Sequence, residues 1–473
     1  MIKELNDCPI VGQFVFYEDE NDKFKGINAF HKAFWYVNDG IEDIVTDLIY
    51  DYKQEHTIRN SSLEIDYTNC MTVIVCNVIR LMTSKKQYIR ISLNSNNFKA
   101  NKRVEKYEPI KITYTVFNNL ITWLAQNDYI NLYKGEANPI IKLGSLIEPL
   151  DKLKDLCLDF NYTSVDLHPD YSLVQLKDEA KNLIDYEDSE ETIYRNKVLK
   201  QYNKFLNKNQ IKIDNELISY PITLESKFNR EIGLNGRIFG GDWMNCKSEL
   251  RETITIDDKD TVELDYSNCA LRLAAHLNGI DVEVDKDLYD IKETKHVRVF
   301  VKRVATRSFN IKASSIQDLA NKVTNSIYVD FREGASFVFA KSFERKNNAT
   351  PEETKRYRDS VEDDIKLNEN NFEYLLNKYG IPWDKPTLKA EILIICNELY
   401  KLAGDYLLNG RGMELQYMDS KICFRIIEQF LELNKPLLTI HDSFVVEKED
   451  KELLRDIMTK SYEEVVGYKP KIK

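Results

Sequence analysis

The hydrophobic pattern of the first half of the chain predicts a helix–strand unit followed by a long polar stretch. Apolar residues three or four positions apart predict a helix that contains Val116, Leu120, Ile121 and Leu124. Asn127 and Asp128 break this pattern, and residues 129–133 alternate as a strand does. From Ser172 to Gln210 the chain is polar, charged and periodic, which predicts an exposed helical hairpin.

The second half of the chain predicts short apolar strands separated by a long helical span. Residues 261–265 read as a strand, and the helix that follows them ends at Gly279. The span from 292 to about 410 is almost wholly helical in pattern. Residues 437–440 and 444–447 then predict two strands joined in a tight hairpin.

The composition indicates a chain that can bury more than one hydrophobic core. Of its 473 residues, 43% are hydrophobic and 30% are charged. It contains no apolar run of about 18 residues and no apolar segment typical of a secretory signal at its beginning. Eight scattered cysteines lack zinc-ligand spacing, so we expect reduced and mostly buried thiols. We therefore expect a cytoplasmic multidomain protein with no membrane segment.

The charge distribution along the chain is uneven, and one segment is strongly basic. The net charge of −11 argues against a surface that binds polyanions everywhere. A basic segment without acids nevertheless contains Arg298, Lys302, Arg303, Arg307 and Lys312. Such a segment is either a solvated helix face or one wall of an anion-binding channel.

Two aspartates lie at the edges of the predicted strands. Asp265 ends the strand at 261–265, and Asp442 lies in the hairpin turn. Either one alone is explained as a turn or cap residue. Carboxylates from two adjacent strands, however, are the hard oxygen ligands that suit Mg²⁺, and two such ions stabilise in-line attack at phosphorus. The pair therefore points to phosphoryl transfer.

Around these aspartates the sequence resembles the DNA polymerase I family and its cousins, the single-subunit phage and mitochondrial RNA polymerases. Residues 265–277 (DYSNCALRLAAHL) are similar to motif A, and residues 439–444 (TIHDSF) are similar to motif C. Arg298 and Lys302 share one helix face and are similar to the motif B pair that grips the incoming triphosphate. The resemblance covers approximately residues 225–473 and rests on the order of its motifs.

Weaker matches of the same resemblance concern contacts with nucleic acid. Arg237, Asn245 and Arg251 resemble the stretch that leads into motif A and touches the primer. Gln416 is similar to the glutamine that contacts the nascent base pair. For His441 the resemblance implies that it orients the hairpin or the primer end, and a hydrogen-bonded turn histidine is the alternative.

Two departures from the family pattern concern the nucleotide. Motif B of the family continues to an aromatic residue that stacks on base and sugar, and Phe309 is the candidate here. DNA-synthesising members carry a glutamate five residues after the motif A aspartate, and its bulk excludes a 2′-hydroxyl. Ala270 stands at that position, and the His-Asp-Ser sequence matches the RNA-synthesising relatives. These differences favour tolerance of ribonucleotides, unless Ala270 packs beneath a differently shaped sugar pocket.

The resemblance implies an α+β fold, the right-hand polymerase with palm, fingers and thumb. The implied parts are a thumb-like helical region at 165–235, a palm at 236–290 and 411–473, and fingers at 291–410. The mixed α/β region 1–150 contains a helix–turn–strand unit that resembles a winged helix. A helix docked on any small sheet gives the same pattern, so both interpretations stay open.

Two further sequence features receive no functional role. The segment LEIDYTNC around Asp66 nearly repeats VELDYSNC around Asp265, but no motif follows it, and we interpret Asp66 as a chance strand-end residue. An exonuclease needs an Asp-x-Glu on an N-terminal strand, whereas the candidates at 185–187 and 188–190 lie in the polar stretch predicted to be helical. We expect no exonuclease.

The implied function is a polymerase that adds NTPs or dNTPs to a 3′-hydroxyl on a nucleic acid template or primer with two Mg²⁺ ions, for which Mn²⁺ can substitute. Asp265 and Asp442 are the catalytic and metal residues. The nucleotide-binding residues are Arg298, Lys302, Phe309 and Ala270, and the nucleic-acid-binding residues are Arg237, Arg251, Gln416 and His441. Partners from replication or defence are compatible with this role. Two other classes stay open: a non-templated nucleotidyl transferase in defence or stress, and a non-catalytic DNA-binding replication protein.

Overall fold

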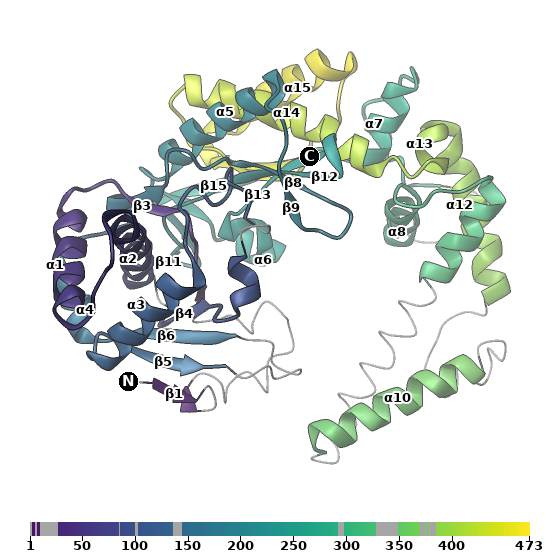
Figure 1. The fold of residues 1–473 in the computed structure, drawn as a ribbon. Coiled ribbons are helices and arrows are strands. Elements are labelled where there is room, and N and C mark those ends of the chain that lie inside the picture. The colour runs from purple at the N-terminus through teal and green to yellow at the C-terminus, as the bar shows by residue number, and fades with distance from the viewer. Residues whose placement is uncertain are drawn as a thin grey trace.

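The part of the chain that the structure describes contains both helices and strands, so the fold is mixed α/β (Figure 1). The computed structural model describes residues 2–4, 7–9, 27–84, 86–99, 103–135, 144–291, 298–327, 349–368, 374, 378 and 385–473. Of the helices in these ranges, none is both long and apolar enough to cross a membrane. All eight cysteines are free, and all except the half-buried Cys246 are buried, as predicted.

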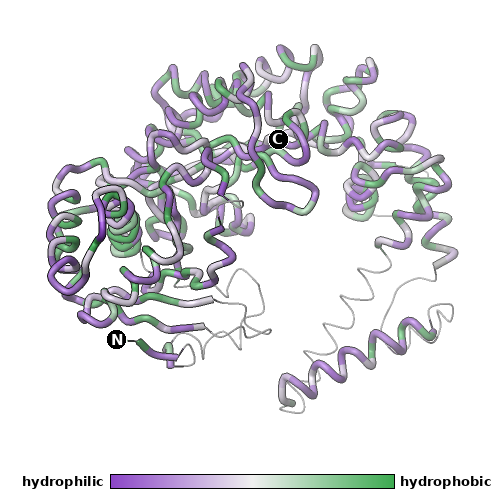
Figure 2. Tube along the Cα trace, viewed as in Figure 1, coloured by the Kyte–Doolittle hydropathy of each residue, from purple (hydrophilic) through white to green (hydrophobic). Residues whose placement is uncertain are grey.

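The N-terminal region is a five-stranded sheet with helices packed on it. In spatial order the strands are β1 (Ile2–Glu4), β5 (Ile130–Lys134), β6 (Ser145–Pro149), β4 (Tyr88–Ile91) and β2 (Ile27–Ala29). The helices are α1 (Gly40–Glu55), α2 (Ser61–Met82), α3 (Tyr114–Gln126) and α4 (Asp151–Leu156). Helix α2 forms the centre of the core, because residues 70–79 are buried on every side and nearly all apolar (Figure 2).

The helix and strand predicted at 116–133 are confirmed. The Thr113 side chain caps α3 by accepting a hydrogen bond from the Val116 amide. The turn to β5 is made by Asp128, whose φ of 59° places it in the left-handed region. Asp66, in contrast, lies inside α2, so its interpretation as a strand-end residue is wrong. The apolar run that follows Asp66 extends the helix instead of ending a strand.

The body contains two further sheets. A four-stranded sheet has the order β13 (Glu231–Phe239), β12 (Glu225–Asn229), β8 (Val174–Lys177) and β9 (Leu183–Ile184). A six-stranded sheet has the order β11 (Glu216–Leu217), β10 (Ile211–Ile213), β14 (Thr255–Ile256), β15 (Lys259–Asp265), β17 (Ser443–Glu447) and β16 (Leu438–Ile440). The helices of the body are α5 (Glu190–Leu206), α6 (Ser248–Arg251), α7 (Cys269–Leu277), α14 (Gly412–Glu432) and α15 (Lys451–Val466). The two-stranded sheet of β3 (Phe34–Tyr36) and β7 (Val165–Leu167) joins body and N-terminal region.

The helical hairpin predicted for 172–210 is wrong. Only α5 is helical there, and it begins at a capping box between Ser189 and Thr192. The segment before it forms β8 and β9, and β8 pairs in parallel with β12, about fifty residues further along. Because β8 gains its strand partner from so distant a segment, local periodicity could not reveal it. The region 165–235 is accordingly not a helical unit.

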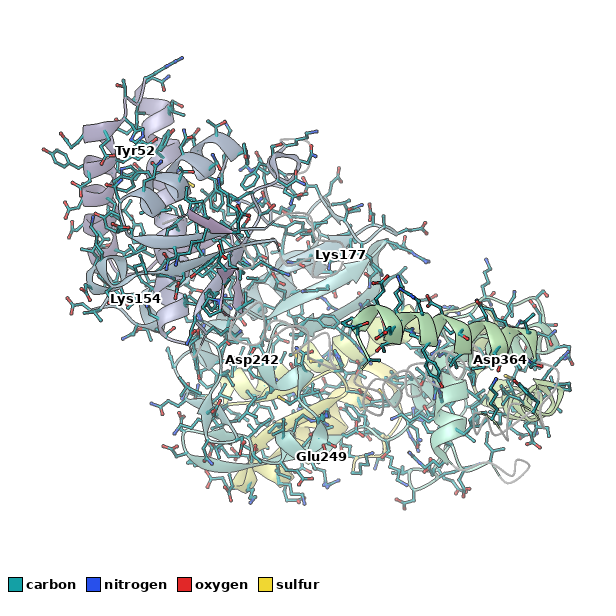
Figure 3. The ribbon with its side chains drawn as sticks, turned by 90° about the horizontal axis from the view of Figure 1, so that it is seen from below. Tyr52, Lys154, Lys177, Asp242, Glu249 and Asp364 are labelled. Carbon is teal, nitrogen blue, oxygen red and sulfur yellow. The ribbon has the colours of Figure 1, made fainter. Side chains whose placement is uncertain are left out.

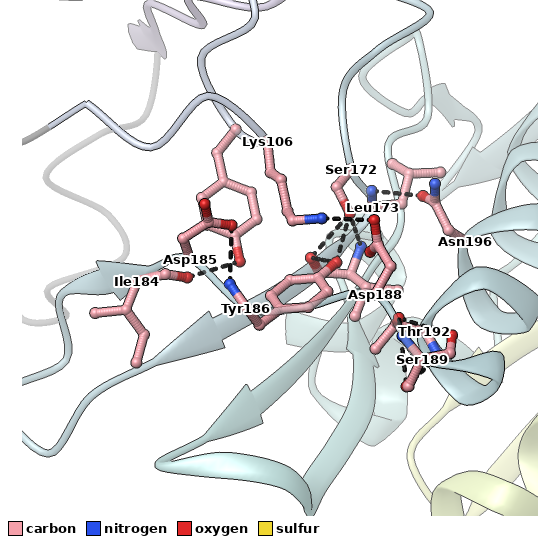
Figure 4. A network of polar contacts seen from close by, with 12 residues as sticks. Lys106, Ser172, Leu173, Ile184, Asp185, Tyr186, Asp188, Ser189, Thr192 and Asn196 are labelled. Carbon is pink, nitrogen blue, oxygen red and sulfur yellow. Dashed lines mark hydrogen bonds and ion pairs between the residues drawn. The ribbon is translucent and has the colours of Figure 1, made fainter.

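A polar network fastens the N-terminal region to this part of the body (Figure 4). The Lys106 ammonium donates to Asp188 Oδ2 at 2.8 Å, and the Lys106 carbonyl accepts from the Ser172 amide at 2.7 Å. Beside it, the Leu176 amide donates to Tyr107 Oη at 2.9 Å. Asp188, which belongs to one of the two Asp-x-Glu candidates, therefore serves as an ion-pair partner.

The helical prediction for 292–410 holds where the chain is described. The helices there are α8 (Arg298–Ser308), a helix at 316–327, α10 (Pro351–Leu367), α12 (Lys385–Ala403) and α13 (Asp405–Leu408). Residues of α8 and α12 belong to the same core as the body, whereas α10, which carries Asp364, lies apart from the N-terminal region and is mostly hydrophilic (Figures 2 and 3). The parts of the prediction that fall on 292–297, 328–348 and most of 369–384 lie outside the described residues.

Candidate active site

Three antiparallel strands position the two aspartates. Asp265 ends β15 opposite Ser443, the first residue of β17, and Ser443 also pairs with Ile440 at the end of β16. The predicted hairpin is thus confirmed, with His441 and Asp442 as its two-residue turn. His441 has a φ of 58°, the left-handed conformation that such tight turns require. The Tyr266 amide donates to the Asp442 carbonyl at 3.2 Å and holds the turn against the end of β15.

A cavity of about 720 Å³ lies at this edge of the sheet. The ten residues to which the sequence assigned catalytic, metal-binding, nucleotide-binding or nucleic-acid-binding roles line it: Arg237, Arg251, Asp265, Ala270, Arg298, Lys302, Phe309, Gln416, His441 and Asp442. Asn245, the other residue of the primer-contact stretch, is not among its lining residues. The ten residues come from β13, α6, β15, α7, α8, α14 and the hairpin, or from residues directly next to these elements. Cavities of about 300–1,000 Å³ are typical of small-molecule sites, so this one has the size for a nucleotide.

The pKa of Asp265 reflects burial and a second carboxylate more strongly than the cations nearby. Burial raises the pKa of Asp265, and the negative charge of Asp442 raises it further. The Lys473 ammonium, 3.1 Å from Asp265 Oδ2, and the charge of Lys302 oppose this rise. A bound cation would offset the burial and the charge of Asp442, which together disfavour the ionised form of Asp265.

The side chains of Asp265 and Asp442 are chemically suited to bind a divalent metal ion. Both supply carboxylate oxygens, and an ammonium group already occupies a cation position beside one of them. Within the described ranges no cluster of three or more His, Cys, Asp or Glu side chains is arranged to hold a metal. The protein would thus contribute two carboxylates, and Mg²⁺ commonly binds through one or two carboxylates together with waters and substrate phosphates.

The predicted phosphate-binding cations lie one helical turn apart on α8. Arg298 Nε donates to Asp287 Oδ2 at 2.5 Å, and its guanidinium lies 5.5 Å from the centre of the Tyr289 ring. Although burial acts in the other direction, hydrogen bonds from Arg298, the Tyr289 amide and Asn268 hold the pKa of Asp287 below its usual value. Arg298 is therefore anchored as a cation at the wall of the cavity. The exposed Lys302 lies beside it and acts on Asp265 through its charge.

Arg251 is fixed by an acid that sequence reasoning missed. Its Nε and Nη2 donate to the two oxygens of Glu263 at 2.8 and 3.2 Å. Ser443 Oγ also donates to Glu263 Oε1 at 2.6 Å. Because Glu263 precedes Asp265 by two residues on a strand, both side chains lie on one face of the sheet. That spacing is the signal that could have identified Glu263.

Arg237 is paired with a second missed acid, Asp419 on α14. Arg237 Nε donates to Asp419 Oδ2 at 2.7 Å, and Cys269 Sγ lies 3.9 Å from Asp419 Oδ1. Burial raises the pKa of Asp419 to about 6; the Arg237 guanidinium opposes this rise and the charge of Asp442 adds to it. Asp419 follows Gln416 by three residues on a helix, so the two share a face. That spacing was its signal in the sequence.

Replacing Asp419 by alanine is expected to destabilise the protein by about 2 kcal/mol. Breaking a fully buried ion pair costs ~3–5 kcal/mol, and the cost is smaller here because a fifth of the Arg237 side chain is exposed. Urea unfolding measures the change. In the double variant Arg237→Met, Asp419→Leu no unpaired charge remains, so it should lose less stability than Asp419→Ala; an equal or larger loss would contradict this account.

Phe309 and Ala270 differ in how far their side chains are exposed to the cavity. Phe309 is only 3% exposed and belongs to the hydrophobic core, so its ring has little free face for stacking on a base. Ala270 lies in the first turn of α7 and is half-buried. Its methyl group leaves space in the cavity that a longer side chain would fill.

His441 packs its ring edge-on against Phe239, with the ring centres 5.3 Å apart. Burial lowers the pKa of His441, Arg237 lowers it further, and Asp442 opposes both. The imidazole is therefore neutral at pH 7. Its buried Nδ1 has no hydrogen-bond partner among the described residues, which does not support the interpretation as a hydrogen-bonded turn histidine.

Comparisons with known proteins add little to this geometry. No family model and no curated protein match the sequence. Among solved structures, the chain aligns with the POL domain of Pol1 from M. smegmatis, solved in complex with DNA primer-template and dNTP. The sequences are 13% identical, the TM-score is 0.21, and the alignment covers 53% of this chain and 46% of that one. The aligned part thus spans less than half the length of that protein, and a score this low carries no conclusion about a common fold.

Proposed function

We propose that the protein is a nucleotidyl transferase that extends a 3′-hydroxyl end of a nucleic acid with nucleoside triphosphates. One observation carries the proposal: ten residues chosen from sequence motifs between Arg237 and Asp442 all line a single cavity of nucleotide size. Two acids at a strand edge and two cations on a helix line this same cavity. That is the charge arrangement that phosphoryl transfer from a metal-bound triphosphate needs.

The residues have separate tasks in this proposal. Asp265 and Asp442 would hold Mg²⁺, which when bound supplies charge neutralisation for the triphosphate and acidifies the attacking hydroxyl. Arg298 and Lys302 bind phosphate oxygens and stabilise charge on the leaving pyrophosphate. Arg251, already held by Glu263, would contact the end of the nucleic acid strand.

Alanine at Arg298 or Lys302 is expected to raise the KM for nucleotide and to lower kcat. A charge-assisted contact contributes about 1.5–3 kcal/mol, so we expect a loss of roughly tenfold to hundredfold in kcat/KM for each variant. Steady-state incorporation assays measure it, and Arg303→Ala is the matched control because Arg303 lies on the same helix but outside the cavity lining. An unchanged KM combined with lost nucleic-acid binding would reassign both residues to a general basic surface.

The proposed activity is tested with the purified chain, Mg²⁺ and labelled dNTPs or rNTPs on primed, unprimed or absent template. Template-dependent extension supports a polymerase. Homopolymers made without template would show a non-templated transferase with the same site. No incorporation under any condition, together with tight DNA binding, would favour the non-catalytic class.

A further inference from the structure

Backbone hydrogen bonds hold the segment 471–473, and with it Lys473, beside Asp265. Residues 471–473 pair with 265–267: the Asp265 amide donates to the Lys473 carbonyl and the Lys473 amide to the Asp265 carbonyl, both at 3.1 Å. The Ser267 amide donates to the Lys471 carbonyl at 2.8 Å. Figure 1 marks this end of the chain beside the central sheet. The backbone of Lys473 is thus part of the structure that carries Asp265.

The Lys473 side chain is attached much less firmly than its backbone. Its ammonium lies 3.1 Å from Asp265 Oδ2, and 61% of the side chain is exposed. Within the described part of the chain this ion pair is the one protein contact of the ammonium, and an exposed ion pair of this kind is weak. A lysine stem has four rotatable bonds, so the ammonium can leave Asp265 without any movement of the backbone.

Three of the four acids that line the cavity differ in how firmly a cation holds them. Glu263 is bound by Arg251, and Asp419 by Arg237, through guanidinium groups at 2.7–2.8 Å. Among the described residues, the one ion pair of Asp265 is with the exposed ammonium of Lys473. The fixed arginine pairs therefore leave Asp265, the acid closest to Asp442 along the sheet, with an exchangeable cation.

We propose that Lys473 is an exchangeable counter-ion, which neutralises Asp265 in the metal-free protein and is displaced when a divalent cation binds. The inference rests on the proposed function, because it takes Asp265 as a metal ligand. Displacement leaves the ammonium in the cavity that Arg298 and Lys302 also line, where it adds positive charge for a phosphate group. Lys473 is thus not a metal ligand; its role is to supply a positive charge, first to Asp265 and then to the cavity.

The test measures the affinity of the full chain for Mn²⁺ in the absence of nucleotide. The electron paramagnetic resonance signal of free Mn²⁺ reports how much of the ion is bound. Removing the competing ammonium in Lys473→Ala should tighten binding about two- to fivefold, as expected for an ion pair of this exposure. Lys473→Arg keeps the charge and should bind as the wild type does. Lys471→Ala is the matched control, because Lys471 lies on the same segment but its ammonium contacts the Asp285 carbonyl.

The outcomes separate this inference from the proposed function. Asp265-dependent Mn²⁺ binding that is unchanged or weaker in Lys473→Ala overturns the counter-ion role and leaves the metal site intact. Equal tightening in Lys471→Ala also overturns it, because the effect would then come from general surface charge. Binding that is absent in the wild type, or unchanged in Asp265→Asn, removes the metal site and with it the basis of both proposals.

Discussion

Replacing Asp265 or Asp442 by asparagine is expected to reduce nucleotide incorporation by about 10³-fold or more, at least ~4 kcal/mol of transition-state stabilisation. Asparagine keeps the size of the side chain and removes the charge that would hold a metal ion. The fold should persist. Burial and the neighbouring Asp442 already disfavour the charged form of Asp265, so a neutral residue there relieves a cost in the metal-free protein. Single-turnover incorporation and a thermal melt measure the two effects.

Asp260→Asn is the matched control for this prediction. Asp260 lies on β15 with Asp265; 72% of its side chain is exposed, and it forms a surface ion pair with Lys448. Its replacement should leave incorporation unchanged. If Asp265→Asn or Asp442→Asn retained more than a few per cent of activity, that aspartate would be excluded from the metal site.

Ribonucleotides are expected to be incorporated nearly as well as deoxyribonucleotides, with discrimination of about tenfold or less, ~1.4 kcal/mol. Ala270 lines the cavity with a methyl group, which leaves room for a 2′-hydroxyl but does not bind it. Ala270→Glu should shift the preference toward dNTPs by about 30-fold or more, ~2 kcal/mol, because the longer side chain fills that space.

Parallel single-turnover incorporation of one rNTP and its dNTP measures this preference. Ala270→Ser is the matched control, since it stays small and should behave as the wild type does. A strong preference for dNTPs already present in the wild type would show that another residue selects the sugar, and Ala270 would then have no such role.

The sequence predicted local structure well wherever one segment contains its own determinants. The α3–β5 unit, the strand that ends at Asp265 and the hairpin around Asp442 all follow from apolar periodicity and turn residues within a few positions. The strand β8 was missed, because the partner that makes it a strand comes about fifty residues later. Local patterns carry no information about such distant pairing.

The two near-identical segments around Asp66 and Asp265 show the same limit. Both segments have a glutamate between two apolar residues, followed by Asp-Tyr. The first segment is helical, whereas the second is a strand that is followed directly by a helix. Asn60 caps the first segment and an apolar run continues it as α2. The second segment pairs with β17 from the far end of the chain, and this pairing decides its conformation.

The sequence by itself determined which residues could take part in chemistry, because the spacing of acids and cations within each motif is local. Only the tertiary structure decided how they are paired. It joined Arg237 to Asp419, Arg251 to Glu263 and Lys473 to Asp265. These pairs form between segments that are brought together by sheet pairing and helix packing across one core. Since charge interactions depend on distance in space and not along the chain, no motif could have shown them.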